Sequence, residues 1–294
     1  MANLKKIRTR IASVKSTRQI TSAMKMVSAA KLRKAQDKIV KLRPYAGKLH
    51  EILVGLSRSL DDSEGENIYG RMSSPEKVLL VVITSNRGLC GGFNANVIRE
   101  TRRVILENYY EQQKQGNLNI ITIGKKGFDY LRKQRQNIIQ EHNDLLNDLT
   151  FENVSVVASG IMQRFVKGEF DRVEIIYNQF KNAAVQNLTT ENFLPVETRP
   201  ADDRVIAPTD YIYEPSKEEI IQELIPKSLR IQFYKAVLDS FVAEHGARMT
   251  AMHKATDNAT ELIRDLTLQY NKARQATITN QILEVVSGAE ALKG

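Results

Sequence analysis

The sequence predicts an α/β protein in which a compact α/β domain is inserted between two long terminal helices. Two observations at the chain ends predict the helices. Residues 3–43 contain no proline or glycine, and residues 227–287 contain only Gly246, although these two residue types are the usual helix breakers. Both segments also carry apolar residues at alternating spacings of three and four. A third observation predicts the inserted domain, because short apolar runs alternate with helical stretches between residues 77 and 177.

The C-terminal helix is expected to run from Lys227 to Leu292. Its seam is predicted from strict three–four spacing and consists of Met252, Ala255, Ala259, Leu262, Leu266, Gln269, Ala273, Ala276, Asn280 and Leu283. Alanine at a seam lets a partner backbone approach closely but buries little apolar area. A helix of this kind is marginal alone, so the sequence predicts a companion helix. The polar positions 269 and 280 are expected to fix the register of the pair.

The N-terminal segment is the predicted companion, in either a parallel or an antiparallel arrangement. Two runs share the seam spacing: Leu4, Ile7, Ile11 and Val14, then Leu32, Ala35, Ile39 and Leu42. Between them the seam positions are polar, and we therefore expect the apolar face to shift to Ile20, Met24 and Val27. Pro44 and Gly47 predict a kink or a change of packing, after which the helical pattern continues.

The inserted domain is predicted to contain a mostly parallel sheet. Residues 57–76 are polar and turn-rich, as expected for a linker or a mobile loop, and residues 77–83 are typical of a strand buried on both faces. After a glycine-rich loop at residues 85–94, the expected elements are a helix at 94–115, a strand at 118–123, a helix at 125–133, a strand at 137–140, a helix at 151–166 and a strand at 173–177. One or two edge strands are expected within 188–214, at 193–196 and 211–213, before Pro215 and Pro226 lead into the last helix.

Charge is concentrated at one end of the chain. Residues 1–43 hold 13 Lys and Arg against one acidic residue, a net charge of +12, whereas the rest holds 30 basic and 33 acidic residues, a net charge of −3. A basic arm indicates an acidic partner, which could be nucleic acid, a membrane surface or a protein. Residues 1–44 contain no Phe, Tyr or Trp on which bases could stack. We therefore expect a protein partner, with a coiled-coil nucleic-acid binder as an alternative.

Enzyme chemistry is poorly represented in the sequence. The loop pattern Gly88-x-x-Gly91-Gly92 matches neither G-x-G-x-x-G nor the P-loop, so we expect these three glycines to make a structural turn. A nucleotide-dependent enzyme remains an alternative. Cys90 has no histidine near it in sequence, and the four histidines are scattered, so no catalytic residue, cofactor or metal site is predicted. No apolar run is long enough to span a membrane, so direct bilayer insertion is not expected.

Three segments carry a resemblance to a known family. They are IRTRIASVKSTRQITSAMKMVSAAKL at residues 7–32, TSNRGLCGGFN at 84–94, and YNKARQATIT through Gly288 and Ala289 at 270–289. In this order they resemble the N-terminal helix, the central loop and the C-terminal signature of the gamma subunit of the bacterial F-type ATP synthase. The resemblance covers the whole chain.

The resemblance implies a mechanical role without catalysis or a cofactor. It implies an antiparallel, left-handed coiled coil of residues 1–60 and 215–294, standing inside a ring of alpha and beta subunits, with a Rossmann-like α/β domain of residues 75–214 beside the epsilon subunit and the membrane c-ring. Rotation of the c-ring, driven by protons, would then be coupled to ATP synthesis or hydrolysis at the beta subunits. The implied location is peripheral, on the cytoplasmic face of the bacterial inner membrane.

The resemblance also implies which residues meet the surrounding subunits. The implied contact and coupling residues are Met24, Lys25, Arg248, Arg274, Gln275, Thr279, Gln281 and Glu284. The family usually has a glutamate where this chain has Gln281, so an ionic role at that position is not expected here. The outward bases of the first helix are expected to pass acidic loops of the other subunits with weak contacts: Lys15, Lys31, Arg33 and Lys34.

Overall fold

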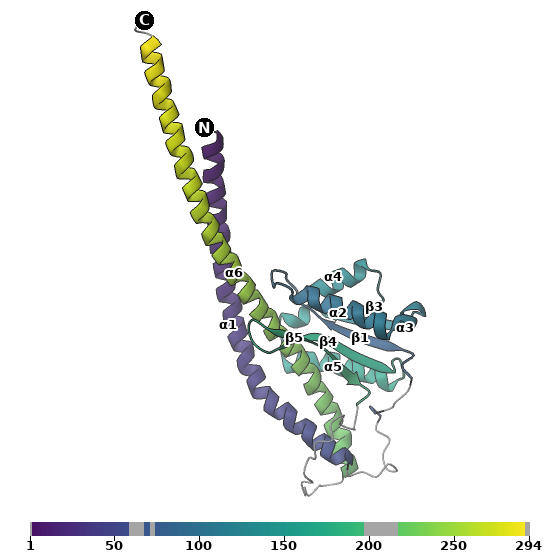
Figure 1. The fold of residues 1–294 in the computed structure, drawn as a ribbon. Coiled ribbons are helices and arrows are strands. Elements are labelled where there is room, and N and C mark those ends of the chain that lie inside the picture. The colour runs from purple at the N-terminus through teal and green to yellow at the C-terminus, as the bar shows by residue number, and fades with distance from the viewer. Residues whose placement is uncertain (1, 59–67, 71–73, 197–216, 292–294) are drawn as a thin grey trace. The chain divides into compact units, whose positions relative to one another are not determined.

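The structure is a computed structural model that describes residues 2–58, 68–70, 74–196 and 217–291. The chain forms two compact units, one of Met1–Ser28 with Arg248–Gly294 and one of Ala29–Ala247. The two long helices, α1 (Ala2–Arg58) and α6 (Lys217–Ala291), each contribute to both units (Figure 1). The predicted class, long terminal helices with an inserted α/β fold, is confirmed.

The second unit contains one sheet of five strands in the order β3-β2-β1-β4-β5. Strands β1 to β4 are parallel, and only β5 runs antiparallel, beside β4. The strands are β1 (Val78–Ile83), β2 (Leu118–Ile123), β3 (Ile138–Glu141), β4 (Arg172–Phe180) and β5 (Gln186–Leu194). The mostly parallel sheet is therefore confirmed, and it is closed at one edge by an antiparallel hairpin.

Helices cover both faces of this sheet (Figure 1). The helices between the strands are α2 (Phe93–Asn108), α3 (Tyr110–Lys114), α4 (Lys125–Lys133), the short 3-10 helix η1 (Asp144–Leu146) and α5 (Phe151–Val166). Val78, Leu80 and Val82 pack in one apolar cluster with residues of α2 and α4. The alternate residues of β1 point to the other face, where α5 and the nearby part of α6 lie. Burial on both faces explains why the strands read as continuous apolar runs.

Two elements differ from the expected boundaries because of tertiary contacts. The helix expected at 94–115 breaks at Tyr109, whose φ of −131° is not helical. The Tyr109 side chain is buried and its hydroxyl donates to Glu174 Oε1 at 2.5 Å. The edge strand expected at 193–196 is instead β5, which ends at Leu194, because residues 186–192 pair with β4. The strand expected at 211–213 lies outside the described residues.

Both long helices continue through a proline. Helix α6 begins ten residues before Lys227, at Lys217, and includes Pro226. The flanking residues Ile225 and Leu229 are 5% and 3% exposed, so their burial offsets the backbone hydrogen bond that the proline removes. Helix α1 includes Pro44, and Figure 1 shows this helix bent in the second unit, as prolines commonly cause.

In the first unit the two helices run antiparallel (Figure 1), and the Thr21 and Thr256 hydroxyls are hydrogen-bonded at 2.8 Å. The predicted shift of the α1 seam is wrong. Thr21 and Ser28 are 8% and 3% exposed, whereas Ile20 and Val27 are 57% and 58% exposed. The seam keeps its three–four spacing through polar residues, because only that spacing stays against the partner helix. These residues are small, and the Thr21 hydroxyl is satisfied, since it also donates to Arg18 O.

The predicted α6 seam is correct at every second position up to Leu266. Met252, Ala259 and Leu266 are buried as predicted. At two of the other predicted positions the covered residue is one place later in the chain, because Ile263 and Tyr270 are more covered than Leu262 and Gln269. Gln269 is therefore not a polar break in the seam.

Asn280 and Leu283 are also wrongly assigned to the seam, since every described side chain after residue 277 is exposed. Ala2 precedes Thr21 by 19 residues, and 19 residues beyond Thr256 is Gln275. Helix α1 therefore begins opposite this part of α6, and the rest of α6 continues as a single helix (Figure 1).

The corrected seam predicts a difference between two aliphatic truncations in the first unit. Leu266→Ala, at a side chain 4% exposed, should lower the free energy of unfolding by about 2–3 kcal/mol. Val27→Ala, at a side chain 58% exposed, should change it by no more than about 0.5 kcal/mol. Chemical unfolding of the full chain, followed by helical circular dichroism, measures both. Equal losses would restore Val27 to the seam.

Candidate functional site

The predicted contact residues of the helix pair lie in two places along α6. Near one end of the first unit, Met24 and Lys25 are half-buried on α1, and Arg248 on α6 is 7% exposed despite its charge. Gln275 and Thr279 are exposed and follow Arg248 by 27 and 31 residues, which is roughly 40–45 Å along a helix. The structure therefore does not bring Met24 and Arg248 together with Gln275 and Thr279.

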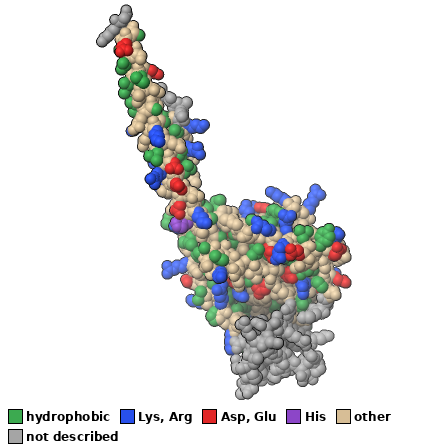
Figure 2. Space-filling model, viewed as in Figure 1, with side chains coloured by type: hydrophobic (Ala, Val, Ile, Leu, Met, Phe, Trp, Pro, Cys, Tyr) green, Lys and Arg blue, Asp and Glu red, His purple; other side chains and the backbone are tan. Residues whose placement is uncertain are grey.

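Among the described residues, the C-terminal end of α6 has no partner helix beside it, and its side chains after residue 277 are exposed to solvent. The remaining predicted residues there, Arg274, Gln281 and Glu284, are all exposed. Apolar side chains lie among them and are 48–71% exposed: Ile278, Ile282, Leu283, Val285 and Val286. Figure 2 shows hydrophobic side chains open to solvent along this end of α6. Exposed apolar surface of this extent is typical of an interaction site.

These apolar residues were missed as a contact surface because Leu283 was assigned to the seam. The available signal was the length difference between the two helices. The second segment without breakers is longer than the first, so some of its apolar positions must lie beyond the reach of α1.

The bases predicted to face outward do so. Lys15 in the first unit, and Lys31, Arg33 and Lys34 in the second, are all exposed. Figure 2 shows basic side chains along the visible face of the helix pair. They lie beside the seam positions rather than on them, so helix pairing leaves their charges available to a partner.

The glycine-rich loop is closed by its own side chains. The Asn94 carboxamide accepts a hydrogen bond from Ser85 N at 2.9 Å and donates to Ser85 Oγ and to Cys90 Sγ. Cys90 is only 2% exposed. Among the three predicted turn glycines, Gly91 alone has a positive φ, of 60°, and its neighbour Leu89 shares that conformation with a φ of 63°. The loop is thus held in shape by hydrogen bonds among its own residues.

A second glycine pair, not predicted from the sequence, holds the carboxyl ends of β1 and β2 together. Gly124 has a φ of 100°, and a Cβ there would lie 2.1 Å from Thr84 O. Gly127 N donates to Thr84 Oγ1 at 2.8 Å. Asn86 extends the junction, because its side chain accepts from Lys125 N and donates to Asn143 O. Protein groups thus satisfy one another at the carboxyl ends of these two neighbouring strands.

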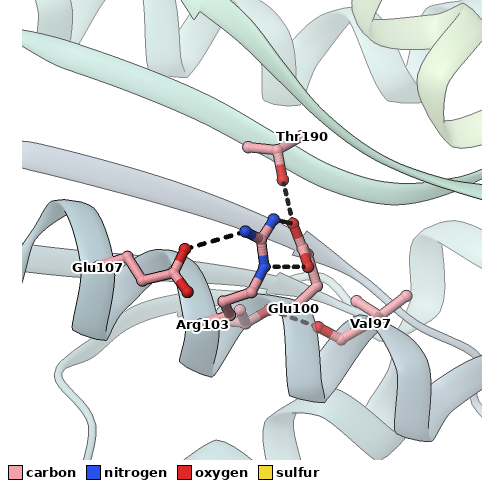
Figure 3. A network of polar contacts seen from close by, with 6 residues as sticks. Val97, Glu100, Arg103, Glu107 and Thr190 are labelled. Carbon is pink, nitrogen blue, oxygen red and sulfur yellow. Dashed lines mark hydrogen bonds and ion pairs between the residues drawn. The ribbon is translucent and has the colours of Figure 1, made fainter.

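An ionic network joins α2 to β5 on the surface of the second unit (Figure 3). Arg103 lies between Glu100 and Glu107, with nitrogen–oxygen distances of 2.5 and 2.9 Å, and Thr190 Oγ1 donates to Glu100 at 3.4 Å. The hydrogen bonds from Arg103 hold the pKa of Glu100 below its usual value. This contribution to stability is present above the ordinary carboxyl pKa and is lost as the pH falls. The network is structural, since its carboxylates are already paired.

No cluster of metal-binding side chains and no membrane-spanning helix is found in the part of the chain that the structure describes. The described His, Cys, Asp and Glu residues form no group of three or more that could hold a metal ion. The described helices are also too polar to cross a bilayer.

The comparisons with known proteins agree on one family. The family model described as ATP synthase matches residues 3–292. The chain is 57% identical to the ATP synthase gamma chain of Flavobacterium johnsoniae over 295 residues, and 47% identical to that of Geobacter metallireducens over 294 residues, with all of each chain covered.

Solved structures agree in fold. A chain in the structure of the Euglena gracilis mitochondrial ATP synthase, described as OSCP/F1/c-ring, has a TM-score of 0.70 at 23% identity, with 99% of this chain and 95% of that chain covered. A chain of the Tetrahymena thermophila central stalk and c-ring has a TM-score of 0.58 at 24% identity, with 80% of this chain and 99% of that chain covered.

The fold defines a class of protein in which two long terminal helices flank an α/β domain, and the predicted contact residues lie on those helices. Within that class, the chain belongs to the ATP synthase gamma chain family, so the resemblance seen in the three motifs is confirmed.

The glycine junction gives a prediction with two matched controls. Gly124→Ala should destabilise the protein by on the order of 3 kcal/mol or more, because the new Cβ meets the Thr84 backbone at a positive φ. Gly91→Ala, with open space at a φ of 60°, should cost about 1 kcal/mol. Gly160→Ala, in helix α5 with open space, should stabilise by up to about 1 kcal/mol. Thermal unfolding of the three variants provides the ranking, and a harmless Gly124→Ala would contradict it.

Proposed function

We propose that this chain is the central rotating shaft of a proton-translocating F-type ATP synthase. The observation that carries the proposal is the helix pair, in which α6 continues beyond α1 as a single exposed helix with an apolar surface. A helix without a cover from its own chain needs a surrounding partner. A sleeve formed by the alpha and beta subunits would supply that cover, and the shaft would turn inside it.

The mechanism depends on asymmetry. A pair of helices that becomes a single helix presents different surfaces to the subunits around it, so each beta subunit would meet a different side of the shaft at any moment. Rotation would then change the state of each beta site in turn. The chain itself carries no catalytic residue in this scheme and needs no cofactor.

The outward bases supply weak contacts. Exposed ion pairs contribute roughly 0–1 kcal/mol each and are screened beyond about 8 Å at physiological salt. Weak, repeated attraction suits a turning shaft, because a strong contact would hold it at one angle. Lys15, Lys31, Arg33 and Lys34 are exposed as this role requires. The contact residues Met24, Lys25, Arg248, Arg274, Gln275 and Thr279 would act along the same shaft.

The rest of the assembly follows from the same proposal. The α/β domain, with boundaries near 75 and 214, would form the foot beside the epsilon subunit and the membrane c-ring. The relatives in solved structures are described with a c-ring, which supports this placement of the foot. The subunit would be peripheral, on the cytoplasmic face of the bacterial inner membrane, without bilayer insertion.

Purification of the tagged chain from its native membranes tests the proposal. Alpha and beta subunits should accompany it, and a probe on the α/β domain should rotate when ATP is hydrolysed. The enzyme alternative requires saturable ATP binding by the isolated chain in calorimetry. The nucleic-acid alternative requires binding to a duplex or single strand with a steep salt dependence.

The basic face gives a prediction in the assembled complex. Changing Lys31, Arg33 and Lys34 to alanine should alter ATPase rate or coupled pumping while assembly is kept, and the difference should shrink at high salt. The control removes three exposed bases of the α/β domain, Arg102, Lys133 and Lys167, and should leave the rate unchanged. A variant that turns over and pumps like the parent at low and high salt would contradict the role.

Gln281 gives a second prediction. Its side chain is exposed on the bare end of α6, so Gln281→Glu should change coupled activity by the equivalent of no more than about 1 kcal/mol. The measurement is ATP synthesis by membrane vesicles. A severe loss would mean that this position is buried against a partner and must stay neutral.

A further inference from the structure

An ion pair ties both long helices to the end of one strand of the sheet. Arg43 Nη2 on α1 donates to Asp239 Oδ1 on α6 and to Phe180 O at the end of β4, both at 3.0 Å. All three residues belong to the second unit. Asp239 is fully buried, whereas the Arg43 side chain is 45% exposed. One guanidinium therefore fixes α1, α6 and β4 at a single point.

A second polar contact joins α6 to the same strands. The Tyr177 hydroxyl on β4 donates to Glu191 Oε2 on β5 at 2.7 Å, and Gln232 Nε2 on α6 donates to Glu191 Oε1 at 2.7 Å. Tyr177 is 1% exposed. Burial, followed by the charge of Glu191, raises the pKa of the Tyr177 hydroxyl, so it stays protonated and able to donate.

The tip of the β4–β5 hairpin gives a third contact with α6. A Cβ at Gly246 would lie 3.2 Å from Ala183 Cα and 3.5 Å from the Phe180 ring. The hairpin backbone thus lies directly against the helix. The Asn182 side chain accepts from Ala184 N and Val185 N, which holds the turn in shape.

Apolar contacts also join α6 to the sheet, such as Phe193 against Phe233 at 5.4 Å between ring centroids. Apolar packing gives affinity without direction. Hydrogen-bonded charges have a preferred geometry and lose energy when it is distorted. The polar contacts therefore set the angle between the helices and the sheet, and the apolar contacts supply the adhesion.

We propose that Arg43 and Asp239, supported by Tyr177, Glu191 and Gln232, form the lock through which torque passes between the α/β domain and the two helices of the shaft. This inference rests on the proposed rotary function. These side chains are positioning residues that resist rotation of the two helices relative to the sheet of the α/β domain. The domain would couple to the rest of the rotor, and from these residues α1 continues unbroken toward its N-terminus and α6 toward its C-terminus.

The charges of the lock determine which variants are informative. Burial raises the pKa of Asp239, and the Arg43 guanidinium opposes that rise. Arg43→Ala would leave a buried carboxylate without its counter-charge, so this variant should be unstable and should recover as the pH falls and Asp239 is protonated. Replacement of both partners by apolar residues avoids that penalty and is often neutral for stability. The double variant Arg43→Met with Asp239→Leu therefore removes the ion pair while stability is kept, so that a change in torque transmission can be measured by itself.

The test uses the assembled complex, immobilised by its beta subunits, with a bead attached through Gln163→Cys, an exposed position on α5. Angular fluctuations of the bead report torsional stiffness, and vesicles report the ratio of pumping to hydrolysis. The double variant should keep its thermal midpoint and its unloaded ATPase rate. Its stiffness should fall about twofold or more, because the directional contact is gone, and pumping against a gradient should fall with it. Lys41→Met, at an exposed base on the same helix, is the control and should change neither.

Three outcomes decide the matter. Parental stiffness and pumping in a stable double variant overturn the lock. If the double variant does not assemble, Asp239→Asn and Tyr177→Phe replace it, and parental stiffness in both overturns the lock in the same way. A parent complex whose bead does not rotate with ATP contradicts the proposed rotary function itself, which is distinct from failure of the lock.

Discussion

The rest of the structure depends on the pairing of the two chain ends. Neither α1 nor α6 can bury its seam alone, since each exposes a line of residues that only another helix can cover. The chain therefore has to bring residues 2–28 back to residues 248–277, which places everything between them in a domain inserted in the middle. The order of elements along the chain is a consequence of this one requirement.

The chemistry of the seam suits a thin shaft. Thr21, Ser28 and Ala259 are buried between the helices, where larger residues would keep the backbones apart. Small side chains bury little area, so hydroxyl contacts such as that between Thr21 and Thr256 contribute to the register. The larger apolar residues Ile20 and Val27 lie outside, where a partner subunit can reach them.

Several polar side chains of the α/β domain form hydrogen bonds within the protein. At the carboxyl ends of β1 and β2, Asn86 and Asn94 hydrogen-bond to the protein itself, and Gly124 lets two strand ends touch. On the other side, Arg43 and Asp239 bind the helices to the sheet. Both features join separate elements of the domain through contacts within the protein.

The sequence by itself determined the family, the two long helices and most elements of the inserted domain. Missing helix breakers and continuous apolar runs are local signals, and they need no knowledge of neighbours. Only the tertiary structure decided which polar residues enter the seam, because burial of Thr21 depends on a hydroxyl 235 residues away. The same holds for the break at Tyr109, set by Glu174, and for the pairing of Arg43 with Asp239. Each of these joins residues distant in sequence, and no local periodicity specifies such a partner.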